Sequence, residues 1–164
     1  MIRRVVQSAL NAKVDEVVVV LGWEARKIRE ILVDLPCRFV LNRDYEEGQS
    51  SSVKAGLREI AEGTEAVLIL PGDVAMIDPH SINAVVDAYH NRSSLIIVAS
   101  HSGRSGHPIL LSKELFKEIE QINEATFGLK SVVARHEDEV LMVETGSENV
   151  LRDVDTPKDL KLVK

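Results

Sequence analysis

The sequence predicts one α/β domain built as a three-layer α/β/α sandwich. Short apolar runs of strand length alternate with segments whose apolar residues recur at helical spacing, and this alternation extends over nearly all 164 residues. We see no internal repeat, low-complexity stretch or linker in the pattern. Residues 1–164 are therefore assigned to a single domain, which is long enough to bury a sizeable core.

The first half of the chain predicts three strands and four helices. A β-branched run that ends at Gly22 predicts a buried strand, and Pro79 suits the first position of a helix. The run of residues 66–70 is apolar throughout, which predicts a strand buried on both faces, as in a parallel sheet. The expected strands are 17–21, 38–41 and 66–70, and the expected helices begin at Ile2 and Pro79 or cover 24–32 and 53–61.

The second half continues the alternation. Ser112 is expected to cap a helix that runs to Ile122, and a glycine-rich turn is expected to precede the strand that begins at His107. The expected strands are 95–99, 107–111 and 140–144, and the expected helices are 112–122, 128–135 and 157–163.

Composition excludes several classes of protein. The formal net charge of -6 leaves no basic excess to neutralise phosphates, which argues against a general nucleic-acid-binding surface. Cys37 is the single cysteine, so an intrachain disulfide is impossible. Charges interrupt the first eight residues before any long apolar stretch, so we expect neither a signal peptide nor a membrane span. A cytoplasmic protein is the expectation.

Asp73 directly follows the strand-ending turn of Pro71 and Gly72. In open α/β sheets, ligands bind at the carboxyl ends of the strands. Carboxylates are also hard oxygen ligands that suit Mg²⁺. The segment taken alone fits a second explanation slightly better, in which Asp73 only caps the following helix.

A second acidic cluster covers residues 153–160. Asp155 or Thr156 as the N-cap, followed by Pro157 at the first helical position, explains most of it as the start of a helix. Asp153 precedes the cap and has no part in that explanation. If Asp153 lies beside the end of the strand that precedes Asp73, the two carboxylates could share a metal ion.

Two polar segments complete the set of candidates. Three serines, at 50–52, open a helix after Asn42 and Gly48, and they either bind an anion or a base or only cap the helix. Residues 103–108 predict a hairpin turn, although Arg104 and His107 together would also suit a phosphate-bearing substrate.

In order along the chain, these segments resemble the molybdenum-cofactor nucleotidyltransferases of the MobA-like family. Residues 42–56 match the family pattern of Asn, an aromatic residue, Gly and a Ser before a helix, and 70–73 match its strand-end Gly-Asp. Residues 103–108 match its Gly-x-x-Gly-His-Pro segment and 153–160 its Asp-x-Asp-Thr-Pro-x-Asp-Leu ending. The resemblance implies a Rossmann-like, mostly parallel sheet of the nucleotide-diphospho-sugar transferase type.

The resemblance also implies an activity: transfer of CMP or GMP from CTP or GTP to the phosphate of molybdopterin, with release of pyrophosphate. The cofactor would be Mg²⁺ or Mn²⁺, with Asp73 as the main ligand and Asp153 as the second, both of them catalytic. The implied nucleotide-binding residues are Asn42, Gly48, Ser52 and Gly72, and the implied substrate-binding residues are Arg104, Gly106 and His107.

The sequence departs from the family pattern in three places. Family members begin with a strand and a phosphate-cradling loop of the form Leu-Ala-Ala-Gly-x-Ser-x-Arg-Met-Gly, followed by a lysine. Residues 1–164 contain no such segment and begin at what resembles the following helix. Residues 74–75 are Val-Ala where Gln-Pro is usual, and 126–128 are Thr-Phe-Gly where Asp-x-Gly is common. We therefore expect residues 1–164 to show no measurable transferase activity.

The absent strand normally lies between those matching residues 17–21 and 66–70. Those two strands could close up, pair with a second copy or leave the protein poorly soluble, and we favour a homodimer. Two other functions remain open. One is a non-catalytic, nucleotide-binding or regulatory relative that acts as a partner subunit. The other is a glycosyltransferase that uses Asp153-Val154-Asp155 as its metal motif, although that motif normally follows a central strand.

Overall fold

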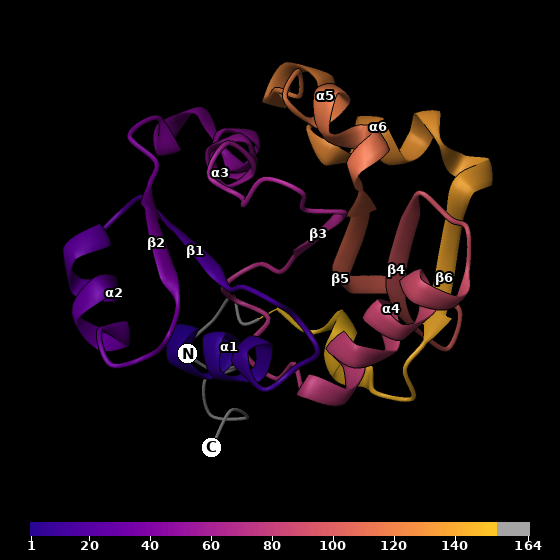
Figure 1. Cartoon of the computed structure of the whole chain (residues 1–164), viewed down its shortest axis with the longest axis horizontal. Helices are drawn as coiled ribbons and strands as arrows, with labels where there is room; N and C mark the ends of the chain where they lie inside the picture. Colours follow the sequence, from indigo (N-terminus) through magenta and orange to yellow (C-terminus); the bar gives the residue numbers. More distant parts are fainter. Residues whose placement is uncertain (154–164) are drawn as a thin grey trace.

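The computed structural model describes residues 1–153 (Figure 1). The expected helix at 157–163 and Asp155 lie outside the described residues. The strands are β1 (Val18–Leu21), β2 (Arg38–Leu41), β3 (Ala66–Ile69), β4 (Ile96–His101), β5 (Arg104–Ser112) and β6 (Val140–Glu144). The α-helices are α1 (Ile2–Leu10), α2 (Ala25–Leu32), α3 (Gln49–Leu57), α4 (Pro79–Asn91), α5 (Phe116–Ile119) and α6 (Leu129–Arg135). Short 3₁₀ segments are η1 (Tyr45–Glu47), η2 (Lys113–Leu115), η3 (Glu124–Thr126), η4 (Glu137–Glu139) and η5 (Glu148–Leu151).

The three predicted layers are present. Helices α1 and α4 lie on one side of the strands, and α3, α5 and α6 lie on the other (Figure 1). Alternate residues of β4 join opposite cores, because successive side chains of a strand point to opposite faces. Ile97 packs in the cluster that contains α4, whereas Ile96 packs in the cluster that contains α5 and α6. A third cluster joins α1 and α2 to β1.

The strands form a mixed arrangement rather than a single parallel sheet. Strands β1 and β2 pair in parallel, and a separate sheet has the order β3-β5-β4-β6. Within that sheet β5 is antiparallel to both β3 and β4, whereas β4 and β6 are parallel. Strands β3, β4 and β6 therefore share one direction and β5 alone is reversed, because it returns from β4 through a tight hairpin at Ser102 and Gly103.

Strands β1 and β3 lie in the middle of the molecule, one beyond the other, but they are not paired (Figure 1). Within the described residues, β1 pairs only with β2 and β3 only with β5. Both faces of β3 pack against a core, as predicted for 66–70: Leu68 packs in the cluster that contains α4 and Val67 in the cluster that contains α5 and α6. Every residue of β3 is, however, only half-buried. In β4, which has a neighbour on each side, all residues except His101 are buried. An apolar strand thus stays partly exposed because it has one neighbour instead of two.

The third helix begins four residues earlier than the apolar pattern of 53–61 predicts. Its first residue is Gln49, after Gly48 with a φ of 97°, and its last is Leu57. The carboxylate of Glu124 accepts a hydrogen bond from the Ser50 backbone N–H, at 2.7 Å, and so caps the helix. This cap comes from 74 residues along the chain, so local sequence does not reveal it.

Two further expectations need correction. The helix expected over 112–122 is mostly broken into η2 and the single α-helical turn of α5, because the Ser112 hydroxyl bonds the Glu114 carboxylate and caps no backbone N–H group. The turn expected over 103–108 is shorter than predicted. Only Ser102 and Gly103 turn, and β5 has already begun at Arg104.

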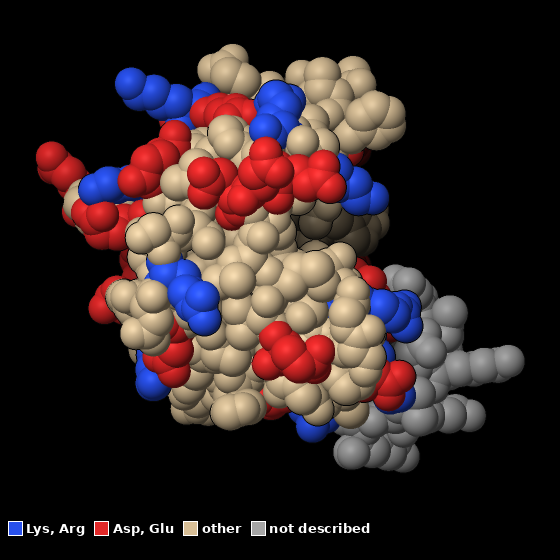
Figure 2. Space-filling model, turned by 90° about the vertical axis from the view of Figure 1, so that its right-hand side faces the viewer, with Lys and Arg blue, Asp and Glu red and all other residues tan. Residues whose placement is uncertain are grey.

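The face that carries α4 and β6 is visible in Figure 2. Acidic side chains gather in a band across its upper half, whereas lysine and arginine side chains are scattered (Figure 2). On this face the described residues form no continuous basic surface for a polyanion. Within the described part of the chain, none of the helices has the length and apolar character needed to cross a bilayer.

Candidate functional site

Asp73 lies in the turn between β3 and α4. Helix α4 is capped by Asp78, whose Oδ1 accepts a hydrogen bond from the Ser81 N–H at 2.8 Å. The helix-capping explanation for Asp73 is therefore wrong. Its Oδ1 atom is buried and has no hydrogen-bond partner among the described residues. A buried carboxylate oxygen without a partner is costly, so a cation or donor is expected to complete this site.

The turn that carries Asp73 is held on both sides. Val74 and Ala75 are fully buried in the core, and the Ala75 N–H donates to the Asp73 carbonyl oxygen at 2.7 Å. On the other side, a Cβ added to Gly72 would lie 3.0 Å from Cδ1 of Ile2. The amino end of α1 therefore lies beside the turn, while the position occupied by Gln-Pro in the family pattern here supplies core packing.

His107 lies on a bulge in β5. Val98 pairs with Ile109, and the next pair is Ser100 with Ser105, so residues 106–108 together face Ala99 alone. Bulges re-aim side chains and are frequent next to active sites. The Nδ1 atom of His107 is buried and has no hydrogen-bond partner among residues 1–153.

Gly106, the first residue of the bulge, allows the end of the described chain to reach β5. A Cβ on Gly106 would overlap the backbone carbonyl oxygen of Val150 in η5. Any side chain larger than hydrogen would therefore push η5 away. Asp153 lies two residues after η5, so the close approach of η5 to Gly106 also brings the Asp153 segment towards β5.

The structure brings His107 within electrostatic reach of both predicted metal ligands. Burial lowers the pKa of His107, and the carboxylates of Asp153 and Asp73 act against this by raising it, with burial the larger effect. The carboxylates of Asp73 and Asp153, from two other segments of the chain, thus lie close enough to act on the pKa of His107. His107 consequently favours its neutral form at a pH where an exposed histidine would be partly charged.

The carboxylates of Asp73 and Asp153 are suitable ligands for a magnesium or manganese ion, but they are too few to fill its coordination shell. Within residues 1–153 no three His, Cys, Asp or Glu side chains gather into a metal-binding group. Mg²⁺, however, usually takes only one or two protein carboxylates and completes its shell with phosphates and water. The buried, partnerless Oδ1 of Asp73 and the nearby Asp153 match that donor set.

Asn42 organises the predicted nucleotide-binding segment. It is buried, and its Nδ2 donates to the hydroxyls of Ser51 and Ser52 at 2.8 and 3.0 Å. Its Oδ1 accepts from the Asp44 N–H at 3.0 Å. Asn42 therefore ties the end of β2 to the first turn of α3, and it places Ser52 rather than presenting a free amide.

Glu124 is a residue of this region that sequence reasoning missed. Its carboxylate sits against the amino end of α3, and its pKa is lowered, first by the hydrogen bond from the Ser50 backbone. A Cβ on Gly48 would lie 2.5 Å from Cγ of Glu124, so the glycine makes room for this carboxylate. No local pattern around Glu124 signals the contact.

Arg104 does not join His107 and the two aspartates. It is exposed at the tip of the β4–β5 hairpin, where it pairs in register with His101. His107 lies within the bulge at 106–108, whereas Arg104 lies in the regularly paired part of β5 beyond Ser105. The charges that act on His107 are those of Asp153 and Asp73.

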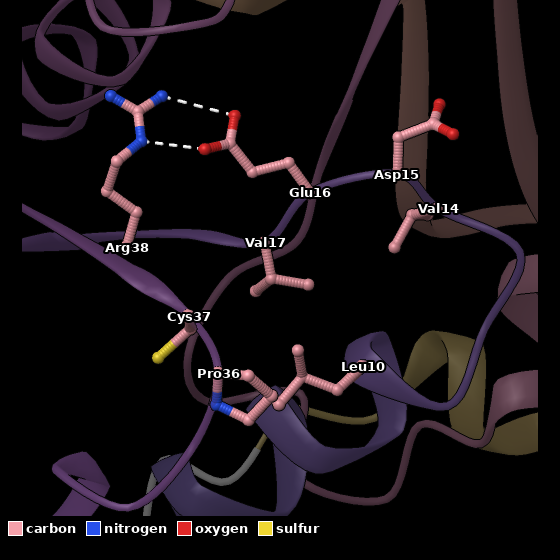
Figure 3. A pocket seen from close by; sticks show the side chains of 8 residues that line it. All are labelled: Leu10, Val14, Asp15, Glu16, Val17, Pro36, Cys37 and Arg38. Atoms are coloured by element: carbon pink, nitrogen blue, oxygen red, sulfur yellow. Dashed lines mark hydrogen bonds and ion pairs between the residues drawn. The ribbon is translucent and has the colours of Figure 1, made fainter.

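A pocket of about 540 Å³ lies at the amino-terminal ends of β1 and β2, whereas the predicted nucleotide-binding segment begins at the carboxyl end of β2 (Figure 3). The Arg38–Glu16 ion pair, at 2.7 Å, closes one side, and Val17, Leu10 and Pro36 line another (Figure 3). It contains none of the predicted site residues.

We expect Gly106→Ala to lower the melting temperature by several degrees. The new methyl group would meet a backbone carbonyl, which is unable to rotate away, and such overpacking typically costs ~1–3 kcal/mol. The matched control is Gly72→Ala, whose methyl group would meet only the flexible tip of Ile2. Thermal unfolding of both variants is the measurement. Equal melting temperatures for Gly106→Ala and the parent would show that η5 does not approach β5 as described.

Comparison with known proteins places this geometry in context. The family described as the MobA-like NTP transferase domain matches residues 1–140. The molybdenum cofactor cytidylyltransferase of Escherichia coli K12 is 26% identical over 145 residues, which are 87% of this chain and 71% of that protein. The bifunctional protein GlmU of Desulfotalea psychrophila is 28% identical over 96 residues. That alignment covers 58% of this chain and spans only 28% of the length of GlmU.

Solved structures show the same fold. The crystal structure of a homologue of Mycobacterium tuberculosis Rv0371c from Mycobacterium sp. strain JC1 superimposes with a TM-score of 0.82 at 23% identity, covering 99% of this chain and 80% of that chain. Rv0371c from Mycobacterium tuberculosis H37Rv in complex with manganese has a TM-score of 0.79 at 21% identity, covering 99% and 84%. The α/β fold of the nucleotidyltransferases is therefore shared.

Proposed function

The chain belongs to the MobA-like NTP transferase domain family, and from this membership we propose that it is a nucleotidyltransferase domain of molybdenum cofactor biosynthesis. It would transfer CMP or GMP from CTP or GTP to the phosphate of a molybdopterin acceptor. One observation supports this most directly: at the carboxyl end of β3, Oδ1 of Asp73 is buried without a hydrogen-bond partner among the described residues, as an unfilled metal ligand would be.

Asp73 and Asp153 would hold Mg²⁺ or Mn²⁺, which when bound neutralises charge on the triphosphate and the departing pyrophosphate. The manganese complex of the related fold supports a divalent ion as the cofactor. His107, whose pKa is lowered by burial, would face the acceptor as a neutral imidazole. Gly106 would contribute by allowing the Asp153 segment to approach.

The proposed reaction joins two phosphates. An oxygen of the acceptor phosphate attacks the α-phosphorus of the nucleotide, a new P–O bond forms, and the bond from that phosphorus to the oxygen bridging to the β-phosphate breaks. The bridging oxygen leaves with its electron pair as part of pyrophosphate. Such a reaction depends mainly on positioning and charge neutralisation, which the carboxylates of Asp73 and Asp153 suit.

The nucleotide would lie along the segment between β2 and α3. Ser52 is held in place by Asn42, and Gly48 turns the backbone into α3, where the Glu124 carboxylate already bonds the Ser50 N–H. Gly72 would add an exposed backbone next to Asp73. The relative from Escherichia coli, a cytidylyltransferase by name, makes CTP the first nucleotide to test and GTP the second.

A second candidate is a non-catalytic relative that binds nucleotide and serves as a partner subunit. The observation that favours it is the break in the sheet between β1 and β3. A pyrophosphate-release assay with CTP or GTP and molybdopterin tests the two. Acceptor-dependent release by the domain supplied with the family's phosphate loop supports the transferase. Nucleotide binding without release under those conditions would favour the partner subunit.

We propose that residues 1–164 associate into a homodimer through the unpaired edges of β1 and β3, which expose backbone N–H and C=O groups to a second chain. Sedimentation at micromolar concentration should show a dimer. Val18→Lys should restore the monomer, because a lysine on an edge strand opposes pairing, and the exposed Val33→Lys is the control. A monomeric parent, or a dimer that Val18→Lys leaves intact, would contradict this interface.

A further inference from the structure

Two aromatic side chains meet where β1 and β2 end. Trp23 follows β1 by two residues, and Tyr45 opens η1 four residues after β2. Because β1 and β2 are parallel, their carboxyl ends lie at the same edge. The two rings are in edge contact, with centroids 6.4 Å apart and planes at 60°.

Trp23 is exposed to solvent and is not part of the core. Its side chain is 71% exposed, although tryptophan is usually buried to a large extent. The next residue, Glu24, has a left-handed backbone with a φ of 52°, which is uncommon for a residue other than glycine. Strained backbone of this kind concentrates at ligand-binding positions.

Tyr45 is held just as specifically. A Cβ on Gly22 would lie 2.6 Å from Cβ of Tyr45, so only glycine at 22 allows the ring this position. The segment leading to Tyr45 is anchored because Asn42 accepts a hydrogen bond from the Asp44 N–H. The same Asn42 holds Ser52, so the aromatic pair and the proposed nucleotide segment are tied to one residue.

The charges around the pair select what can bind. Glu24 adjoins Trp23 and forms an ion pair with Lys27. Glu46 and Glu47 adjoin Tyr45, whose hydroxyl donates to Glu46 Oε1 at 3.5 Å, and all three carboxylates are exposed. Acidic neighbours disfavour a phosphate at this spot and favour an uncharged ring whose amino groups donate hydrogen bonds. Cytosine and guanine both carry such an exocyclic amino group, whereas uracil does not.

We propose that Trp23, supported by Tyr45, is the stacking surface for the nucleobase of the bound nucleotide. This inference rests on the proposed function, since it places the base of the same nucleotide whose phosphates face Asp73. It also assigns a preference to the site: bases with an exocyclic amino group are favoured over uracil. Aromatic stacking of a base is sequence-tolerant, so the carboxylates and not the rings supply the preference.

The chain contains one tryptophan, so its fluorescence reports on Trp23 alone. Adding CTP or GTP with Mg²⁺ should change the emission and shield the indole from acrylamide. Inorganic tripolyphosphate, which has no base, should do neither, and UTP should bind more weakly than CTP. By calorimetry, Trp23→Leu should weaken CTP binding ~10-fold, because stacking of one base is worth roughly that factor, and leave tripolyphosphate binding unchanged.

Val33→Ala is the control, because Val33 is also exposed, at 73%, but lies at the carboxyl end of α2, away from the proposed nucleotide segment. It should leave CTP binding unchanged. The contrary result is that CTP binds without changing the fluorescence of Trp23, and that Trp23→Leu binds CTP as tightly as the parent. That result would overturn the assignment of Trp23 as the stacking surface and leave the proposed function standing. If calorimetry detects no nucleotide binding to the parent protein, the proposed function and this inference both fail.

Discussion

Asp73→Asn is expected to remove metal-dependent nucleotide binding. The substitution keeps the shape of the side chain and one oxygen, but it removes the negative charge and replaces the other carboxylate oxygen with an amide nitrogen that does not bind a metal ion. Since Mg²⁺ and Mn²⁺ use only one or two protein carboxylates, loss of one should weaken binding ~10-fold or more. Calorimetric titration of Mn²⁺ with CTP into both proteins measures the effect, with heat expected for the parent and much less for the variant.

Asp15→Asn is the control for this experiment. Asp15 is an exposed carboxylate at the amino-terminal ends of β1 and β2, so Asp15→Asn removes one negative charge, as Asp73→Asn does, without changing the proposed site. We expect parent-like binding from it. An Asp73→Asn protein that binds Mn²⁺ and CTP as tightly as the parent would end the assignment of Asp73 as a metal ligand. Asp153→Asn should show a smaller loss, because Asp153 is exposed.

The second large effect concerns the phosphate-cradling loop. Residues 1–164 are expected to release no measurable pyrophosphate from CTP or GTP. A chain extended before Met1 by a family strand, loop and lysine should release pyrophosphate. One lost donor at the centre of charge development typically costs ~10²–10³ in rate, and the loop supplies several. The geometry suits such an extension, because the amino end of α1 lies beside Gly72 and Asp73.

The control is the same extension with its loop glycines, Arg and Lys replaced, so that the strand is added without the phosphate site. This chain should become more stable, because the edges of β1 and β3 gain a partner, but it should stay inactive. Turnover by residues 1–164 near that of a complete relative would show that the loop is dispensable. An inactive, fully extended chain that still binds CTP would favour the non-catalytic partner.

Much of the fold is predictable because its signals are local. Arg38–Leu41 and Val140–Glu144 have the predicted bounds, and α4 begins at Pro79 as the residue type implies. Short-range chemistry decides these elements: a short apolar run makes a strand, and a proline opens a helix. Helix α3 was misplaced because its cap, Glu124, comes from a distant segment.

Some features of the candidate site are likewise predictable from local sequence, and others are not. Asp73 could be singled out because a strand, a proline and a glycine deliver it to the end of a strand. The sequence could not show that Asp73 leaves α4 uncapped. Asp78 lies five residues later and is equally suited to the cap by residue type, and in the structure it is Asp78 that caps the helix. Likewise the sequence gives no sign that His107 lies in a bulge of β5, whereas Arg104 pairs regularly with His101 at the tip of the hairpin.

The sequence by itself determined the alternation of strands and helices, the carboxylates at 73 and 153, and the absence of a phosphate loop within residues 1–164. Only the tertiary structure decided that Asp73 and Asp153 lie close enough to act on the pKa of His107, that Gly106 admits η5, and that β1 and β3 remain unpaired. The reason is physical. Periodicity and turn chemistry act over a few residues, whereas burial, electrostatic reach and strand pairing depend on segments that only folding brings together.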